Sequence, residues 1–81
     1  MSARGMPKLQ FASGTEAKEL RRKLGLNQSE FWARIQVTQS GGSRYENGRE
    51  MPEPVQLLLH LSYAPRKQAA ALFEYLRSEK K

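Results

Sequence analysis

Gln39, Ser40 and Arg44 are the side chains of this sequence best suited to a chemical task, because they fall on one short stretch and each can hydrogen-bond a DNA base. Gln can bind the edge of adenine through two hydrogen bonds, and Arg can bind O6 and N7 of guanine. Ser is short enough to reach either a base or a phosphate. The alternative is an ordinary solvated helix face, since polar residues on exposed helices are common.

An α-helix lying in the major groove presents its N-terminal side chains to the bases, so these residues require a helix with a defined start. Thr38 offers an N-cap directly before Gln39. Asn47 and Gly48 provide the stop, because Gly readily adopts the left-handed conformation that closes a helix and Asn is next best. The sequence therefore predicts a helix from Gln39 to about Glu46.

A second short helix is expected immediately before it. Asn27 is followed three residues later by Glu30, which is the spacing of a capping box, so this helix should begin near Gln28. Phe31 and Ile35 lie four residues apart on its inner face. Two short helices joined by a tight turn have the layout of a helix-turn-helix.

Residues 15–62 resemble the Xre and lambdoid-phage repressor (Cro-type) group of helix-turn-helix regulators. The motifs that carry the resemblance are Leu20-Arg21, Gly25-Leu26-Asn27-Gln28, the Val37-Thr38 turn, and Glu46-Asn47-Gly48-Arg49 followed by Pro52. No single motif is specific to the group, but their order and spacing together make a strong resemblance. The resemblance implies an all-α, compact five-helix, lambda-repressor-like DNA-binding domain.

The resemblance also assigns roles to individual residues. It implies that Gln28 anchors on a DNA phosphate and that Gln39, Ser40 and Arg44 face base edges. The full set of predicted DNA-contacting residues is Asn27, Gln28, Thr38, Gln39, Ser40, Ser43, Arg44 and Arg49. Members of this group commonly pair an arginine of the first helix with the glutamate that ends the recognition helix. Here these are Arg21 and Glu46, and such a pair would clamp the first helix to the third.

Two linked departures from the group's pattern suggest an exchange of volume. Trp32 occupies a position that is normally a small Ala, and Gly42 occupies the facing position, which is normally Val or Ile. Because protein interiors are densely packed, we predict that the indole fills the space of the missing branched side chain. Alternatively, Gly41 and Gly42 mark a loosened or shortened helix that tightens only on DNA.

Gln36 is a third departure, since the group usually has Gly at this turn position for a positive φ. Either Gln36 bears a strain of roughly 1 kcal/mol in the left-handed region, or the turn is reshaped.

Composition fits a small binding module. The chain has 81 residues and a formal net charge of +6, without cysteine and with His60 as its single histidine. Disulfides, thiolate zinc sites and histidine metal clusters are thereby excluded, and no nucleophile or carboxylate set surrounds His60, so we expect it to be structural or superficial. We expect no enzyme activity, no cofactor and no metal. The absence of an apolar leader or membrane span, together with the resemblance, leads us to expect a cytoplasmic, nucleoid-associated protein of a bacterium or phage.

Charge and composition divide the chain into three parts. Residues 1–13 carry +2 through Arg4 and Lys8 and are expected to form a flexible basic arm, which either contacts the DNA backbone or minor groove or has no role. Residues 14–62, the helix-turn-helix core, carry only +1, and the C-terminal helical part, 63–81, carries +3. The positive charge favours a polyanionic partner, although most of it lies outside the predicted reading unit.

A helical frame should support this unit. A capping box at Ser13 and Glu16 opens a first helix that ends at Gly25. The remaining helices are expected after Glu53-Pro54 and after Ala64-Pro65. The residues expected to face inward are Ala17, Leu20 and Leu24 in the first helix, and Val55, Leu57, Leu58 and Leu61 in the fourth, which should be buried on more than one side. In the fifth helix, Ala69, Leu72, Phe73 and Leu76 form a stripe that either closes the core or faces a second subunit.

The function predicted from the sequence is a sequence-specific DNA-binding transcriptional regulator, a repressor that binds double-stranded DNA as a homodimer. One alternative is the antitoxin of a toxin-antitoxin pair, which would autoregulate its operon and bind a toxin protein, because the segment from Ser43 to Glu46 also resembles antitoxin domains. Another is a protein-interaction adaptor that does not bind DNA. No membrane partner is expected.

Overall fold

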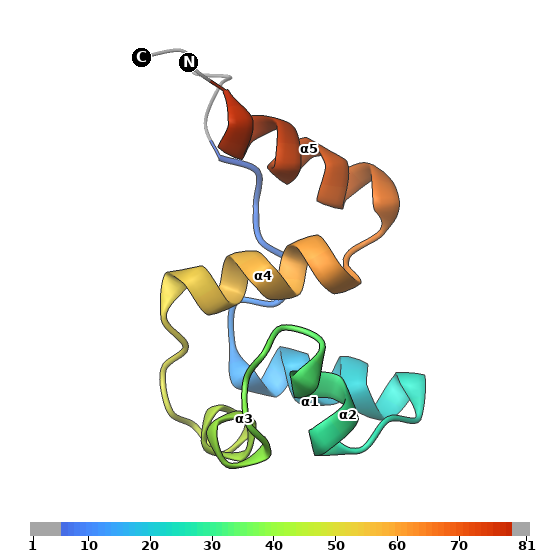
Figure 1. Ribbon diagram of the computed structural model, residues 1–81, viewed down its shortest axis with the longest axis vertical. Helices are drawn as coiled ribbons and strands as arrows, with labels where there is room; N and C mark the ends of the chain where they lie inside the picture. Colours follow the sequence, from blue (N-terminus) through green and yellow to red (C-terminus); the bar gives the residue numbers. More distant parts are fainter. Residues whose placement is uncertain (1–5, 79–81) are drawn as a thin grey trace.

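The computed structural model describes residues 6–78, in which a non-helical N-terminal segment is followed by five α-helices joined by short connections (Figure 1). They are α1 (Gly14–Leu24), α2 (Gln28–Ala33), α3 (Gln39–Glu46), α4 (Glu53–Tyr63) and α5 (Arg66–Arg77). No strand occurs between residues 6 and 78. The all-α, five-helix class predicted from the sequence is confirmed.

The helix ends form where the local capping residues place them. Ser13 and Glu16 form a capping box at α1, with Glu16 N 3.3 Å from Ser13 Oγ and Ser13 N 3.2 Å from Glu16 Oε1. Asn27 and Glu30 form the second box, in which Glu30 N donates to Asn27 Oδ1 over 2.8 Å. α1 closes at Gly25, whose φ of 73° lies in the left-handed region. These boundaries follow from neighbours in sequence, so they are predictable without the fold.

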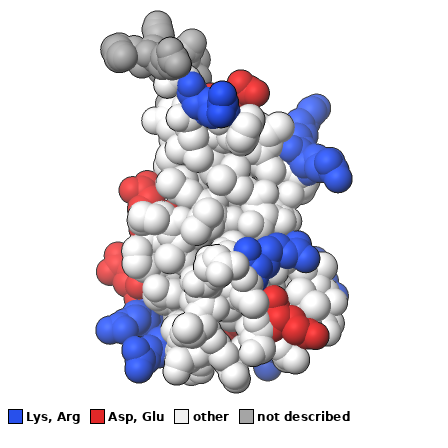
Figure 2. Space-filling model, in the orientation of Figure 1, with Lys and Arg blue, Asp and Glu red and all other residues white. Residues whose placement is uncertain are grey.

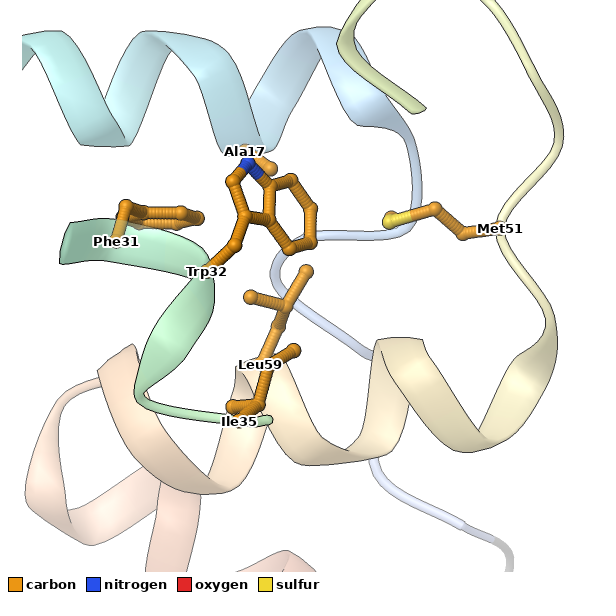
Figure 3. Close-up of a cluster of buried hydrophobic side chains, with 6 residues drawn as sticks. All are labelled: Ala17, Phe31, Trp32, Ile35, Met51 and Leu59. Atoms are coloured by element: carbon orange, nitrogen blue, oxygen red, sulfur yellow. The ribbon is translucent and has the colours of Figure 1, made fainter. Parts of the chain in front are cut away.

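The core gathers around the Trp32 indole (Figure 3). The ring lies beside Ala17 of α1 and above Leu59 of α4, and it meets Phe31 edge to face with 5.2 Å between ring centroids. The buried hydrophobic residues of this cluster are Ala17, Phe31, Trp32, Ile35, Met51 and Leu59. Tyr63 joins α4 to α2, because its ring stacks on Phe31 at 4.4 Å and its hydroxyl donates to Phe31 O at 2.8 Å.

The helix-turn-helix and α5 occupy opposite ends of the molecule (Figure 1). α1, α2 and α3 lie together at one end, α4 crosses the middle, and α5 packs on the far side of α4. The helix that carries the predicted base-reading residues is therefore remote from the helix that carries the C-terminal apolar stripe.

Several residues expected to face inward do not. Leu24, in the last turn of α1, is 49% exposed, so its expected burial is wrong. In α4, Leu58 is 42% exposed, whereas Leu59 and His60 are fully buried. The reason is that a run of consecutive apolar residues does not specify which side of a helix meets its neighbours. Of the predicted residues in α4, Val55 packs against the core, where Leu59 and Tyr63, which were not predicted, join it.

The apolar stripe of α5 is partly buried in the domain and partly exposed on its surface. Leu72 is fully buried and Ala69 half-buried, so this side of the stripe packs inward. Phe73 and Leu76 are 49% and 45% exposed. α5 thus closes the domain with one edge and leaves an apolar edge on the surface.

His60 has the structural role expected of it. Its Nδ1 accepts a hydrogen bond from Gln10 N at 3.1 Å, so the ring proton resides on Nε2, which lies 3.0 Å from Gln68 O. One buried ring thereby joins the N-terminal segment, α4 and α5. Phe11 packs against the core and Ala12 N donates to Glu16, so residues 10–13 are anchored, unlike the free arm that their composition suggested. Arg4 of that arm lies outside the described residues.

Candidate nucleic-acid interface

α3 presents one polar face outward and one closely packed face inward. The side chains of Gln39, Ser40 and Arg44 are exposed, as is that of Thr38, the N-cap residue. Gly42 and Glu46 are buried on the side of α3 opposite Ser40 and Arg44, whereas Gln39 is exposed because it lies at the start of the helix. Ser40 and Arg44 thus extend from the outward side of α3 and Gln39 from its N-terminal end, where a base-reading helix presents its side chains.

Trp32 and Gly42 show the exchange of volume predicted from the sequence. A Cβ atom added to Gly42 would overlap Cδ1 and Cγ of Trp32 and would lie 2.6 Å from its Nε1, so no side chain fits there. α3 is an uninterrupted helix through Gly41 and Gly42. The glycine therefore allows a close helix-helix approach, and its helix-weakening effect is offset by contact with the indole.

α3 is held at its other end by a contact that sequence reasoning missed. A Cβ atom added to Gly14, the first residue of α1, would overlap the carbonyl group of Tyr45 and would lie 3.1 Å from Glu46 N. The backbones of α1 and α3 touch at this point. Only the glycine at a helix start hinted at it, because such a position does not itself require glycine.

Glu46 is the most highly coordinated side chain of the site. Its Oε2 accepts from Arg21 Nε and Trp32 Nε1, each at 2.9 Å, and its Oε1 accepts from Arg21 Nη2 at 3.0 Å and Gln28 Nε2 at 3.1 Å. The Glu46 side chain is 1% exposed and that of Arg21 is 14% exposed. The two residues form the ion pair that the resemblance implied, with two donors that sequence reasoning did not foresee.

The electrostatics of this cluster keep Glu46 charged. Burial by itself raises the pKa of the Glu46 carboxyl, but hydrogen bonds from Arg21, Trp32 and Gln28, together with the arginine charge, outweigh it and lower the pKa below its ordinary value. Arg21 also donates through Nη1 to Leu26 O at 3.0 Å. One ionised carboxylate therefore joins α1, α2 and α3.

The other predicted DNA-contacting residues differ in how far their side chains are already engaged within the protein. Gln28, at the start of α2, is half-buried and directs its amide nitrogen to Glu46. Asn27 and Thr38 use their side-chain oxygens as caps, accepting from Glu30 N and Gly41 N, so only the Asn27 amide group and the Thr38 hydroxyl hydrogen could donate to a phosphate. Ser43 is half-buried, and its Oγ accepts from Asn47 at 3.4 Å.

The turn between α2 and α3 keeps its geometry at the expense of backbone strain. Gln36 has a φ of 65°, a left-handed conformation that costs roughly 1 kcal/mol for a residue with a side chain. Val37 N donates to Trp32 O at 3.1 Å, which closes the turn. The sequence left open whether Gln36 is strained or the turn is reshaped. The positive φ of Gln36 shows that the residue is strained.

On the face shown in Figure 2, charge alone does not mark an interface. Lys and Arg side chains in Figure 2 lie apart around the outline, with acidic side chains among them and an uncharged centre. Arg44 and Arg49 are exposed, whereas Arg34 lies over the Tyr63 ring, 4.6 Å from its centroid. The candidate site is therefore defined by the polar face of α3 and not by a basic patch.

Metal-binding groups and membrane-spanning helices are both absent from residues 6–78. No group of three or more His, Cys, Asp or Glu residues there could hold a metal ion. No helix in the same part has the length and apolar character needed to cross a membrane.

Comparison with known families agrees with this geometry. The family described as the RsaL-like HTH domain matches residues 18–62, which is more than half of the chain and includes α2, the turn and α3. No curated protein and no solved structure matches the sequence. The match supports the helix-turn-helix resemblance but does not assign the chain to the Xre or Cro type.

Proposed function

Since the chain belongs to the RsaL-like helix-turn-helix domain family, we propose that it is a sequence-specific DNA-binding transcription regulator that represses by occupying an operator. The observation that carries this proposal is the outward face of α3. Ser40 and Arg44 are exposed there and Gln39 is exposed at the start of the helix, while Trp32 and Gly14 hold the inward side of α3 against α2 and α1. A helix held in this way can present polar groups in a fixed geometry, which discrimination between bases requires.

The roles of these residues follow from their chemistry. Gln39 binds adenine, Arg44 binds guanine through O6 and N7, and Ser40 contacts a base or a phosphate. The surrounding contacts to the sugar-phosphate backbone come from Asn27, Gln28, Thr38, Ser43 and Arg49. Such contacts set the register of α3 on the duplex without reading the sequence.

A homodimer is the form that fits this site best. α3 has eight residues, so one copy reads few base pairs, and two copies related by a twofold axis double the site. Phe73 and Leu76 form the exposed apolar edge of α5, which we assign to the dimer contact. Two copies should place their α3 helices about 34 Å apart, which matches one turn of B-DNA.

The experiment that tests this function is selection of bound sites from a pool of random duplexes. A repressor of this kind should enrich one palindromic site, and its affinity should fall as salt rises. Enrichment of a single half-site would contradict the dimer. No enrichment, with binding that does not respond to salt, would favour an adaptor protein instead.

In an antitoxin, α3 would bind DNA in the same way, but the exposed apolar edge of α5 would bind a toxin protein and not a second copy of the chain. The exposed Phe73 and Leu76 fit a partner protein as well as a second copy. The two roles separate in sedimentation, because the purified chain dimerises by itself only in the first.

A further inference from the structure

Glu46 is the point at which the buried framework meets the proposed DNA-contacting surface. Its side chain is buried, yet one of the groups that it binds is Gln28, the half-buried first residue of α2. We infer that Glu46 is a positioning residue for DNA binding, which sets the direction of the Gln28 amide so that one of its N–H groups points toward a phosphate. This inference rests on the proposed function and names a residue that acts through another.

The chemistry of the carboxylate decides which end of the Gln28 amide faces inward. An ionised carboxylate only accepts hydrogen bonds, whereas an amide has a donating nitrogen and an accepting oxygen. Gln28 Nε2 lies 3.1 Å from Glu46 Oε1. The reversed amide would place two accepting oxygens against each other with no proton between them, so only the nitrogen can occupy this place.

Glu46 can impose this direction because it cannot itself turn away. Arg21 binds both carboxylate oxygens, at 2.9 Å and 3.0 Å, and Trp32 Nε1 binds Oε2 at 2.9 Å. Trp32 is fully buried and its indole is packed against Gly42. Together with Gln28, these N–H groups occupy the acceptor positions of the carboxylate. All of the donors belong to residues of α1 or α2.

The consequence concerns the second hydrogen on Gln28 Nε2. One N–H is directed to Glu46, and the other is the donor that a phosphate oxygen requires. A Gln side chain without such a partner would sample several rotamers and both amide orientations, and binding would have to order it. Glu46 performs this ordering before DNA arrives.

A double-mutant cycle in duplex binding tests the inference, with Glu46→Gln and Gln28→Ala in the full chain and with both the selected site and a random duplex. The Gln at position 46 can present either oxygen or nitrogen, so it no longer dictates the Gln28 direction. We expect Glu46→Gln to weaken binding to both duplexes roughly two- to tenfold, the value of one neutral hydrogen bond. We expect no further weakening when Gln28→Ala is already present.

The salt dependence of binding supplies a second signature. A neutral amide releases no counterion, so neither Glu46→Gln nor Gln28→Ala should change the slope of log affinity against log salt. Arg49→Ala serves as the charged comparison and should reduce the magnitude of that slope by about 0.9 if Arg49 contacts a phosphate.

The outcomes separate the inference from the function on which it rests. A Glu46→Gln effect that persists in the Gln28→Ala background, or that is confined to the selected site, would show that Glu46 acts through α3 alone. That result overturns the inference and leaves the regulator intact. A wild type without salt-sensitive duplex binding overturns both.

A measurement on the wild type keeps the inference testable if Glu46→Gln does not fold. In NMR spectra, one Gln28 side-chain amide proton should exchange slowly with water and should not respond to DNA. The other should shift when the selected duplex is added. Two amide protons that exchange equally fast, with no shift on DNA binding, would contradict the assignment.

Discussion

Arg44 carries the most specific chemistry on the outward face of α3. Its guanidinium group has the fork geometry that matches two acceptors of guanine, and the side chain is exposed. We expect Arg44→Ala to relax the preference at one base pair of each half-site, because such a contact contributes about 1 to 3 kcal/mol of discrimination. Titrations against single-base-pair variants of the selected site measure this loss.

Arg66→Ala is the matched control for Arg44. Arg66 is an exposed arginine at the start of α5, at the other end of the molecule, so its replacement removes the same charge without touching α3. It should leave the preference for bases unchanged. If Arg44→Ala weakens all site variants equally, Arg44 contacts a phosphate and not a base.

Glu46 makes stability depend on acidity. Its pKa is lowered in the folded protein because the hydrogen bonds and charge of its partners outweigh burial, so the unfolded chain takes up the proton more readily. The stabilisation is therefore complete above the ordinary value of 4.5 and is lost as the pH falls through the lower folded-state value. Urea unfolding at pH 7 and at several pH values below 4.5 should show the advantage of wild type over Glu46→Gln shrinking with acid. A constant difference would mean that the charge of Glu46 is not what stabilises the fold.

At the scale of elements, α3 depends on its neighbours more than on its own sequence. Gly41 and Gly42 each cost about 1 kcal/mol relative to Ala in a helix interior, so an isolated helix of this sequence would be marginal. Trp32 packs against Gly42, and the α1 backbone contacts the end of α3 at Gly14. The α3 helix therefore depends on contacts with the rest of the domain.

The contact between α2 and α3 can be tested with a thermodynamic cycle. Gly42→Val should destabilise by about 1 to 3 kcal/mol through overpacking, although Val is the better helix former. Trp32→Ala should cost about 3 to 5 kcal/mol, since the ring is fully buried. The double variant should be more stable than the sum predicts, because the valine fills part of the cavity.

The recovery in this double variant should nevertheless be incomplete. Trp32→Ala also removes the Nε1 donor 2.9 Å from Glu46, and a valine cannot replace it. Denaturant unfolding of the four proteins measures the coupling, and additive free energies would contradict the contact.

At the scale of the whole molecule, the two apolar sides of α5 serve different purposes. Leu72 faces α4 in the interior, while Phe73 is half exposed beside it in sequence. Phe73→Asp should therefore give a folded monomer that binds half-sites weakly. Leu72→Asp, which places the same charge one residue away in a buried position, should unfold the domain.

Sedimentation and circular dichroism on these two variants distinguish the roles. A folded monomeric Phe73→Asp protein places the dimer contact on the exposed edge of α5. If Phe73→Asp still dimerises, the dimer contact lies elsewhere on the molecule. A wild type that stays monomeric on DNA would exclude a homodimer through α5.

The sequence by itself determined the features that depend on neighbouring residues. Both capping boxes, the Thr38 cap and the left-handed Gly25 formed where expected, because a cap needs only residues within one turn. The exchange of Trp32 with Gly42 was also predictable, since a known motif spacing brings these two positions together. The chosen DNA-contacting residues remain a prediction, based on resemblance and on their exposed polar chemistry.

Only the tertiary structure decided the features that depend on packing between distant segments. The exposure of Leu24, the contact of Gly14 with Tyr45 and the division of the α5 stripe all follow from helix orientations that local patterns do not specify. The same holds for the direction of Gln28, whose partner is 18 residues away. Neighbouring residues determine where a helix begins and ends, but the contacts of its side chains depend on how whole helices pack against one another.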